Sequence, residues 1–350
     1  MSRLQALGWG PFLDAQLSAE ERASLLAGRA IEDRGARLLV GFEDGDRLVT
    51  LPGRLRAAGG APVVGDFVLA RPGDEPPVAR VLARRSQISR GVAGRTTGEQ
   101  VLAANVDLVF LVNGLDAGVN PRRIERTLAA VVASGAEPVV VLTKLDLEDE
   151  PAVALAEAAA AAPASRVLAV SATAGIGVDA VRALLAPGLT GVFVGPSGSG
   201  KSTLVNALLG AEVQATAEVR SWDARGRHKT TGRRLFALAG GGAVIDGPGI
   251  RELKLWDAAG LDAAFEDVAA IAAGCRFRDC AHEDEPGCAV REAVEAGRLD
   301  PARLESLRKL EAEARAAAAR RGGAEARAEK QRWRAVAKEI RRFYKDRRRE

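Results

Sequence analysis

A glycine-rich segment, Gly195-Pro-Ser-Gly-Ser-Gly-Lys-Ser202, has the residue types and spacing of a phosphate-binding loop. It follows an apolar run and opens the segment KSTLVNALLG, which has the pattern of a helix. Glycines let backbone N–H groups turn toward phosphate oxygens, and the helix N-terminus adds partial positive charge. Lys201 would reach the β- and γ-phosphates and act in catalysis, and the Ser202 hydroxyl would ligate Mg²⁺. The predicted phosphate-binding residues are Gly195, Pro196, Ser197, Gly198, Ser199, Gly200, Lys201, Ser202 and Thr203.

A second motif, Thr143-Lys144-Leu-Asp146, ends an apolar run and resembles the N-K-x-D base-reading motif of GTPases. A carboxylate such as Asp146 can accept hydrogen bonds from both N1–H and the amine of guanine, whereas N1 of adenine is itself an acceptor. The aliphatic stem of Lys144 can cover the base. Thr143 stands where the usual motif has Asn, which puts one loop-bracing hydrogen bond in question. The alternative interpretation is an ordinary turn at the end of a strand.

Two further strand ends carry residues of the same kind of site. Ser171-Ala172 resembles the companion loop whose backbone N–H contacts guanine O6. Asp246-Gly-Pro-Gly249 resembles the D-x-x-G motif, in which Asp246 would bind Mg²⁺ through water and the Gly249 N–H would sense the γ-phosphate. Thr230 or Thr231 would close over Mg²⁺ in the triphosphate state. The sequence leaves that choice open, and we carry Thr231 with Ser202 as the magnesium ligands.

All three cysteines of the chain lie in one short segment, Cys275-x4-Cys280-x-His282-x5-Cys288, together with one of its two histidines. Three thiols and an imidazole suit tetrahedral Zn²⁺ in a closed structural site with no position left for water. Such clustering also argues against a disulfide framework in a reducing compartment. We therefore predict one structural zinc ion, with a metal-free reduced loop as the alternative.

The elements that must position these residues change character along the chain. Residues 1–30 are weakly patterned and read as an extension or short helices. Residues 31–95 contain short β-like runs broken by Gly, Pro and Asp, which suits a small antiparallel OB-type barrel. From 100 to 256, apolar strands at 107–112, 138–143, 166–171, 190–195 and 242–246 alternate with helical stretches at 121–134, 151–162, 178–186 and 200–210.

Such alternation predicts an α/β fold with a parallel sheet covered on both faces and a ligand beyond the carboxyl ends of the strands. Residues 257–350 lack β signals, and helices are expected at 258–273, 289–297, 301–320 and 326–346 around the cysteine-rich loop. We therefore expect three domains after the N-terminal extension: a barrel, an α/β domain and a helical zinc-binding domain with a basic tail.

The order of the motifs is diagnostic, because the base-reading residues 143–146 and 171–172 precede the phosphate loop instead of following it. This order is a circular permutation of the GTPase sheet. Such a permutation is tolerated because the termini of a compact domain usually lie close together. A barrel, a permuted P-loop GTPase domain with GPSGSGKS and DGPG, and a Cys/His helical domain together resemble the RsgA (YjeQ) family of ribosome small-subunit-dependent GTPases. The motif order covers about residues 31–300.

The resemblance implies roles beyond those read from the residues. Many GTPases place a water-positioning Gln after D-x-x-G, but this chain has Ile250, so intrinsic hydrolysis should be slow. The family carries an R-G-x-H-T-T-T segment with a histidine considered to position water, and His228 matches it as the catalytic residue, with Lys229 replacing the first Thr. A surface histidine in a basic loop is the alternative. The family also carries the zinc site at the same place.

Composition and charge bear on the partners of the protein. Hydrophobic residues make up 47% of the chain and charged residues 27%, which excludes global disorder. Residues 327–350 hold eleven Arg or Lys against four Asp or Glu, so this tail carries +7 and the rest of the chain −3. A basic tail on an acidic body suggests a polyanionic partner or a solvated helix. No secretory signal or membrane span is evident, so we expect a cytoplasmic protein without a membrane partner. We also expect it to be a monomer.

We therefore expect an enzyme that hydrolyses GTP to GDP and phosphate. By resemblance, it would bind the 30S ribosomal subunit and its 16S rRNA late in the maturation of that subunit and would be stimulated by it. A P-loop ATPase or kinase is one alternative. The other is an RNA-binding protein with a purely structural nucleotide site, which Ile250 favours.

Overall fold

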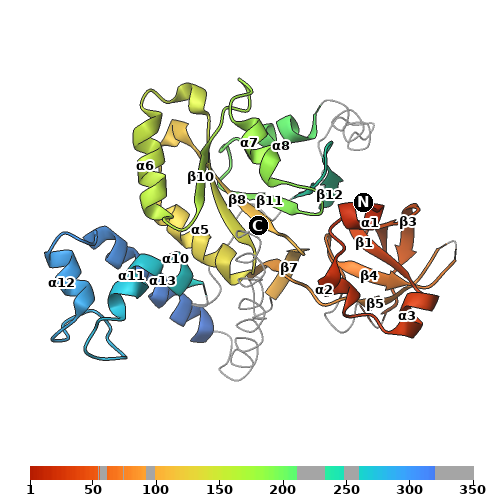
Figure 1. The fold of residues 1–350 in the computed structure, drawn as a ribbon, viewed down its shortest axis with the longest axis horizontal. Helices are drawn as coiled ribbons and strands as arrows, with labels where there is room; N and C mark the ends of the chain where they lie inside the picture. Colours follow the sequence, from red (N-terminus) through yellow and green to blue (C-terminus); the bar gives the residue numbers. More distant parts are fainter. Residues whose placement is uncertain are drawn as a thin grey trace.

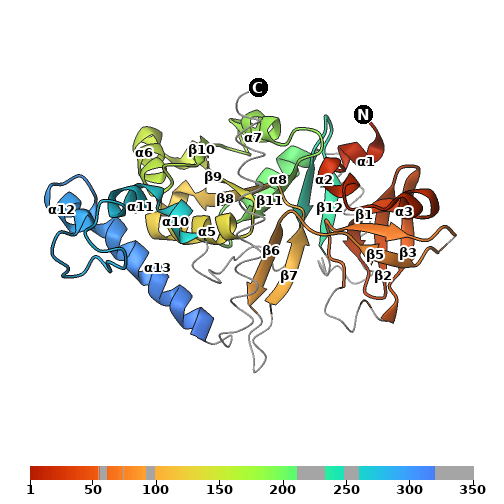
Figure 2. The ribbon, with the colours of Figure 1, turned by 60° about the horizontal axis from the view of Figure 1, so that its bottom comes forward.

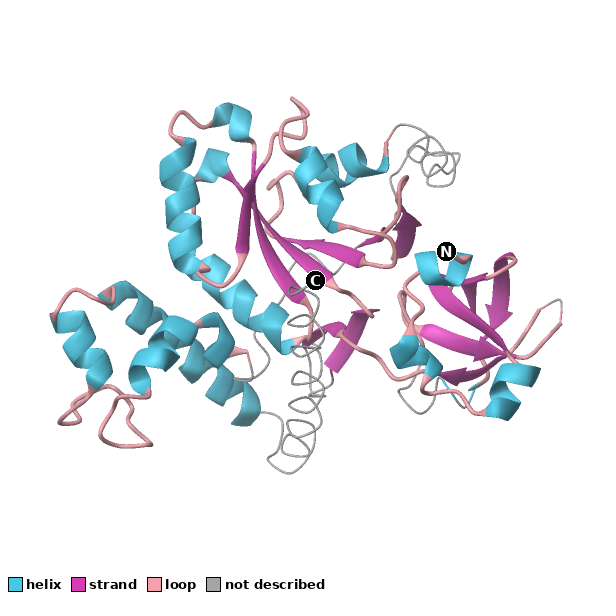
Figure 3. Ribbon diagram, in the orientation of Figure 1, coloured by secondary structure: helices cyan, strands magenta, loops and turns pink. Residues whose placement is uncertain are grey.

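The computed structural model describes residues 1–53, 55, 61–73, 75–91, 99–210, 233–247 and 260–319. An N-terminal β-rich part and a C-terminal helical part lie on opposite sides of a central α/β part (Figure 1, Figure 3). No helix among these residues is long and apolar enough to cross a membrane.

The central part is built on five parallel strands in the order β10-β9-β8-β11-β13. They are β8 (Leu108–Gly114), β9 (Glu137–Thr143), β10 (Arg166–Ala169), β11 (Thr190–Val194) and β13 (Ala243–Asp246). The helices between them are α5 (Pro121–Ala133), α6 (Pro151–Ala161), α7 (Val178–Leu184) and α8 (Lys201–Leu209). The predicted alternation of strands and helices is confirmed.

The two faces of this sheet are covered by different helices. Because side chains alternate along a strand, Val109 and Leu111 of β8 pack in one hydrophobic cluster with residues of α5 and α6. Phe110 and Val112 of the same strand pack in a second cluster with residues of α7 and α8. Strands β8, β9, β11 and β13 are largely buried on both faces, which explains their nearly continuous apolar runs, whereas the edge strand β10 is only partly buried.

The N-terminal part begins with three short helices, α1 (Arg3–Ala6), α2 (Pro11–Asp14) and α3 (Ala19–Ser24), and continues as antiparallel strands. Their order is β3-β2-β1-β4-β5, and a parallel bridge between Thr50 and Pro77 links its two ends. The strands are β1 (Leu26–Asp33), β2 (Arg37–Phe42), β3 (Gly45–Thr50), β4 (Phe67–Ala70) and β5 (Val78–Val81). This closed arrangement agrees with the expected OB-type barrel.

The first barrel strand lies partly in the segment that we expected to be an extension, since β1 starts at Leu26. Its sequence, LAGRAIED, does not indicate a strand because it contains a glycine and an arginine at central positions. A Cβ at Gly28 would lie 2.5 Å from Cγ1 of Val40 on β2, so a larger residue does not fit there. The domain boundaries themselves stay predictions.

The barrel is joined to the central sheet by backbone pairing that the sequence did not indicate. Strand β12 (Arg234–Ala237) runs antiparallel to β13, and its Arg234 pairs with Glu32 of β1. A separate ribbon of β6 (Gln87–Gly91) and β7 (Glu99–Ala104) leads from the barrel into β8 (Figure 2).

A buried arginine lies at the same junction. The Arg29 guanidinium donates hydrogen bonds to the carbonyls of Leu7 (2.6 Å), Asn105 (2.9 Å) and Gly65 (3.2 Å), and to Oγ1 of Thr190 on β11 (2.7 Å). Burial lowers the pKa of Arg29 to about 10. The barrel and the strand that leads to the phosphate loop therefore share one polar contact in the interior.

The C-terminal part consists of helices α10 (Leu261–Ala264), α11 (Glu266–Ala272), α12 (Ala289–Glu295) and α13 (Pro301–Ala319), close to the expected ranges. The helix expected at 326–346 and the basic tail lie outside the described residues. Arg303 of α13 joins this part to α5: it donates to Glu125 of α5 (2.8 Å) and to both oxygens of Asp267 of α11 (2.6 and 2.7 Å). The Ser306 hydroxyl donates to the second oxygen of Glu125.

Candidate functional site

The phosphate loop connects β11 to α8 and depends on its glycines. Three of its glycines have positive φ values, which residues with a Cβ rarely adopt: +149° at Gly195, +81° at Gly198 and +82° at Gly200. A Cβ at Gly195 would also lie 2.2 Å from the carbonyl oxygen of Val112 on β8. The loop is therefore held close to the neighbouring strand in a conformation that requires glycine.

Lys201 is the first residue of α8, and its side chain is buried against the loop. Its ammonium group donates to the Pro196 carbonyl and to Oγ of Ser199 (3.2 Å). Ser202 and Thr203 follow in the first turn of α8 and are exposed, as is Ser197 in the loop. The first turn of α8 thus presents hydroxyls and backbone N–H groups to solvent at the positively polarised end of the helix.

Thr143, the last residue of β9, contacts the phosphate loop directly. Its hydroxyl donates to the carbonyl of Ser199 at 2.6 Å and lies 3.3 Å from the carbonyl of Asn113. Thr143 is buried, with 2% of the residue exposed. Although Thr143 stands where the usual motif has Asn, its hydroxyl therefore still links the loop after β9 to the phosphate loop.

The other base-reading residues lie in two adjoining loops. Lys144 has a left-handed backbone (φ +60°), and the exposed Asp146 follows it within the short helix η2 (Leu145–Leu147). The backbone N–H of Leu145 donates to the carbonyl of Val170 (3.1 Å), immediately before Ser171-Ala172. Ser171 is buried and exchanges two backbone hydrogen bonds of 2.9 Å with Ile176. The loops after β9 and β10 are therefore adjacent.

Asp246 ends β13, the strand on the other side of β11, and is half-buried. Since Val192 pairs with Ile245 in parallel register, Asp246 lies at the same edge of the sheet as Gly195. The predicted residues His228, Thr230, Thr231 and Gly249, together with Ile250, lie outside the described residues.

The structure thus brings the phosphate loop, Thr143-Lys144-Leu-Asp146, Ser171-Ala172 and Asp246 to the carboxyl edge of one parallel sheet. Ligands of open α/β sheets bind at this edge. The strands that carry the base-reading loops, β9 and β10, precede the phosphate-loop strand β11 in the chain. They belong to the same sheet, in which β8 lies between β9 and β11. This arrangement defines a circularly permuted P-loop GTPase domain.

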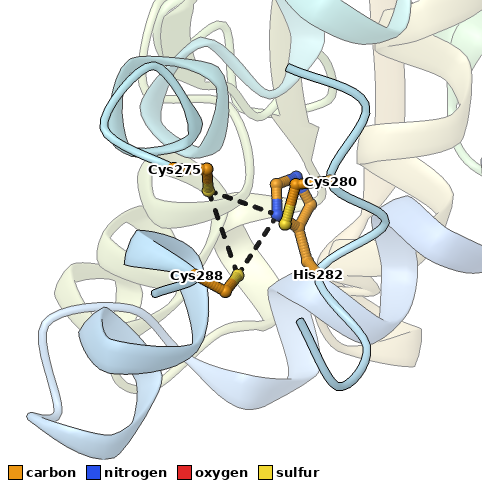
Figure 4. A group of neighbouring side chains, drawn as sticks. All are labelled: Cys275, Cys280, His282 and Cys288. Carbon is orange, nitrogen blue, oxygen red and sulfur yellow. Dashed lines mark hydrogen bonds between the residues drawn. The ribbon is translucent and has the colours of Figure 1, made fainter. Parts of the chain in front are cut away.

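The predicted metal ligands converge from the loop between α11 and α12 (Figure 4). The ligand atoms of Cys275, Cys280, His282 and Cys288 all lie within 4.8 Å of one another. Nδ1 of His282 lies 3.4 Å from Sγ of Cys288 and 3.6 Å from Sγ of Cys275, and these two sulfurs are 3.9 Å apart. A tetrahedral zinc ion with ordinary bond lengths requires about 3.5 Å between N and S and about 3.8 Å between two sulfurs. The residues fit zinc.

The backbone around this cluster supports it. His282 has a left-handed conformation (φ +61°), and its carbonyl accepts a hydrogen bond from the Arg308 guanidinium of α13. Burial works against ionisation of the Cys288 thiol, but backbone N–H groups of Arg291 and Val290 at the start of α12 lower its pKa overall. Burial raises the pKa of the Cys280 thiol to about 11.

Comparison with known proteins agrees with this geometry. The family described as RsgA GTPase matches residues 81–256. The small ribosomal subunit biogenesis GTPase RsgA of Opitutus terrae is 43% identical over 95% of both chains. The protein of the same name from Methanosarcina acetivorans is 44% identical over 84% of this chain and 81% of its own.

Solved structures give the same result. YjeQ from Thermotoga maritima superposes with a TM-score of 0.64 at 27% identity, covering 83% of this chain and 98% of that one. YloQ, described as a circularly permuted GTPase, gives 0.61 at 25% identity, covering 85% and 98%. The chain belongs to the RsgA GTPase family and is a GTP-hydrolysing enzyme.

Sequence reasoning missed the end of β8 and the turn that follows it, which contribute Asn113, Gly114 and Asp116 beside the predicted residues. The available signal was positional: the run at 107–112 ends at the same edge of the sheet as the four strands that carry the predicted motifs. It carries no motif of its own.

Proposed function

We propose that this GTPase acts in the biogenesis of the small ribosomal subunit, docking on the 30S subunit late in its maturation and leaving when GTP is hydrolysed. The names of relatives that match 84–95% of the chain support the part of this proposal that concerns small-subunit biogenesis. The observation that carries the nucleotide site is the contact between Thr143 and Ser199, which links the guanine-reading loop to the phosphate loop.

Each part of the site has a distinct task in this proposal. Backbone N–H groups of the phosphate loop and the N-terminus of α8 bind the phosphates, and Lys201 exchanges its Pro196 and Ser199 contacts for phosphate oxygens. Asp146 accepts hydrogen bonds from guanine, and the backbone at Ser171-Ala172 donates to O6. Ser202 and Thr231 would hold Mg²⁺, with Asp246 acting through water. The ion would neutralise charge that develops on the phosphates.

Hydrolysis requires a water molecule positioned for attack on the γ-phosphate, and we assign the positioning of this water to His228. Slow turnover by the free protein and faster turnover on the subunit follow if the partner orders this residue. The 16S rRNA is the polyanion expected to contact the basic tail, and we expect the protein to act as a monomer.

The Cys275, Cys280, His282 and Cys288 cluster would hold one structural zinc ion. Its four donors would complete the coordination of a tetrahedral ion, so the zinc would shape the loop between α11 and α12 and would not activate water.

The test is GTP turnover with and without purified 30S subunits, using Lys201→Ala as the loss-of-function control. We expect clear stimulation by 30S subunits and no turnover by the variant. An identical rate with and without subunits would refute the ribosomal part of the proposal.

Base choice is tested separately with Asp146→Asn, because an amide can donate to the C2 carbonyl of xanthine where a carboxylate cannot. The variant should bind xanthosine nucleotides better and guanosine nucleotides worse than the wild type. Asp149→Asn, which alters another exposed carboxylate nearby, is the matched control. If Asp146→Asn retains full discrimination for guanine, the base is read elsewhere.

A further inference from the structure

The loop after β8 places a carboxylate against the lysine of the base-reading motif. Asp116 lies in the short helix η1 (Leu115–Ala117), and its Oδ2 is 2.6 Å from Nζ of Lys144. The side chains are 43% and 28% exposed, so the pair lies at the rim of the site. No motif of the sequence predicts this pair, because its members are far apart in the chain.

Gly114 shows how closely the pair packs on the phosphate loop. Its φ of −80° is available to any residue, so conformation does not require glycine here. A Cβ at this position would instead lie 2.5 Å from Oδ1 of Asp116, 3.4 Å from Cα of Ser199 and 3.6 Å from Cδ of Lys144. The stem of Lys144 therefore crosses Gly114 beside the phosphate loop, with Asp116 holding its charged end.

We infer that Asp116 is a positioning residue for guanine-nucleotide binding, acting through Lys144. A lysine side chain without a partner samples many rotamers, and fixing one of them on ligand binding costs conformational entropy. The ion pair with Asp116 fixes the stem before the nucleotide arrives, so the stem forms a ready surface for the base. This inference rests on the proposed role of the Thr143-Lys144-Leu-Asp146 loop in base reading.

The experiment is a double-mutant cycle on the affinity for fluorescently labelled GDP, with wild type, Asp116→Ala, Lys144→Ala and the double variant. Exposed ion pairs are weak, so we expect Asp116→Ala to raise the Kd about threefold. In the Lys144→Ala background the same change should have no further effect, because its target is gone. Asp116→Glu should restore part of the affinity. Equal effects of Asp116→Ala in both backgrounds, or no effect in either, would overturn the inference.

Two measurements separate positioning from general damage. Inorganic pyrophosphate competes for the phosphate loop alone, so Asp116→Ala should leave its inhibition constant unchanged; equal weakening would mean that Asp116 supports the phosphate loop instead. Glu313→Gln removes a comparably exposed ion pair with Arg126, far along α13, and should not change GDP affinity.

Gly114→Ala gives an independent prediction. The added methyl group displaces the Asp116 carboxylate, which is the end of a flexible side chain, so the protein should fold and bind GDP as weakly as Asp116→Ala does. Wild-type affinity in this variant would contradict the inference. Failure of the wild type itself to bind GDP would instead refute the proposed function.

Discussion

The two parts that flank the central sheet are attached to it in contrasting ways. The barrel continues the sheet through the pairing of β12 with β1. Among the residues that the structure describes, its buried Arg29 hydrogen-bonds only to neutral partners, namely three carbonyls and the Thr190 hydroxyl. The C-terminal helices form no strand pairs among the described residues. Their buried Arg303 instead bonds two carboxylates, Glu125 and Asp267.

The partners of each arginine determine what its charge costs. Burial lowers the pKa of Arg29 to about 10, since the attraction of Asp107 and Asp66 only partly offsets desolvation. Burial also opposes the charge of Arg303, but hydrogen bonds and attraction from Asp267 and Glu125 raise its pKa overall. Loss of Arg303 would leave two carboxylates unpaired, whereas loss of Arg29 leaves only neutral acceptors. The C-terminal attachment should therefore be the more sensitive one.

Removing zinc should have the largest effect on stability, and the loss of stability should be confined to the C-terminal part. Structural zinc sites contribute about 10–16 kcal/mol of binding free energy in small peptides, and that energy stabilises the fold. Chelation should therefore abolish the hydrogen-exchange protection of α12, while the amides of β1 and β4 keep theirs. Cys288→Ser should reproduce this pattern without a chelator. Equal loss of protection in the barrel would contradict the prediction that zinc stabilises only the C-terminal part. Intact protection of α12 in protein shown to be metal-free would contradict it as well.

Arg303→Met should have the next largest effect. Removing one partner of a buried ion pair typically costs about 3–5 kcal/mol, because the remaining charge is left unpaired in the interior. This cost should be large at Glu125, because burial already disfavours its charged form and raises its pKa. Urea denaturation followed by circular dichroism measures the free energy of unfolding.

The control for Arg303→Met is the double variant with Glu125→Leu, which removes one of the stranded carboxylates and should recover part of the stability. A loss below about 1 kcal/mol for Arg303→Met alone would mean that Glu125 and Asp267 find other partners.

These two arginines also show the limits of sequence reasoning. The parallel strands were predictable because buried apolar runs alternate with helices, and the phosphate loop because its glycines have one structural purpose. Arg29 and Arg303 were not, since arginine is mostly exposed and its spacing reveals nothing about a buried partner. Asp116 escaped for a related reason: its role depends on a contact with Lys144, which only the sheet order creates. His228 and Thr231, outside the described residues, stay predictions.

Arg29→Met should cost less than Arg303→Met, about 1–3 kcal/mol, because it leaves neutral acceptors without donors and removes a desolvated charge at the same time. Thr190→Val, which removes the one side-chain acceptor of Arg29 within the described part of the chain, should cost less again, and the same denaturation experiment measures both. A loss for Arg29→Met equal to that for Arg303→Met would mean that neutral carbonyls hold a buried guanidinium as firmly as carboxylates do. In that case the two attachments would be equally sensitive to the loss of their buried arginine, despite their different chemistry.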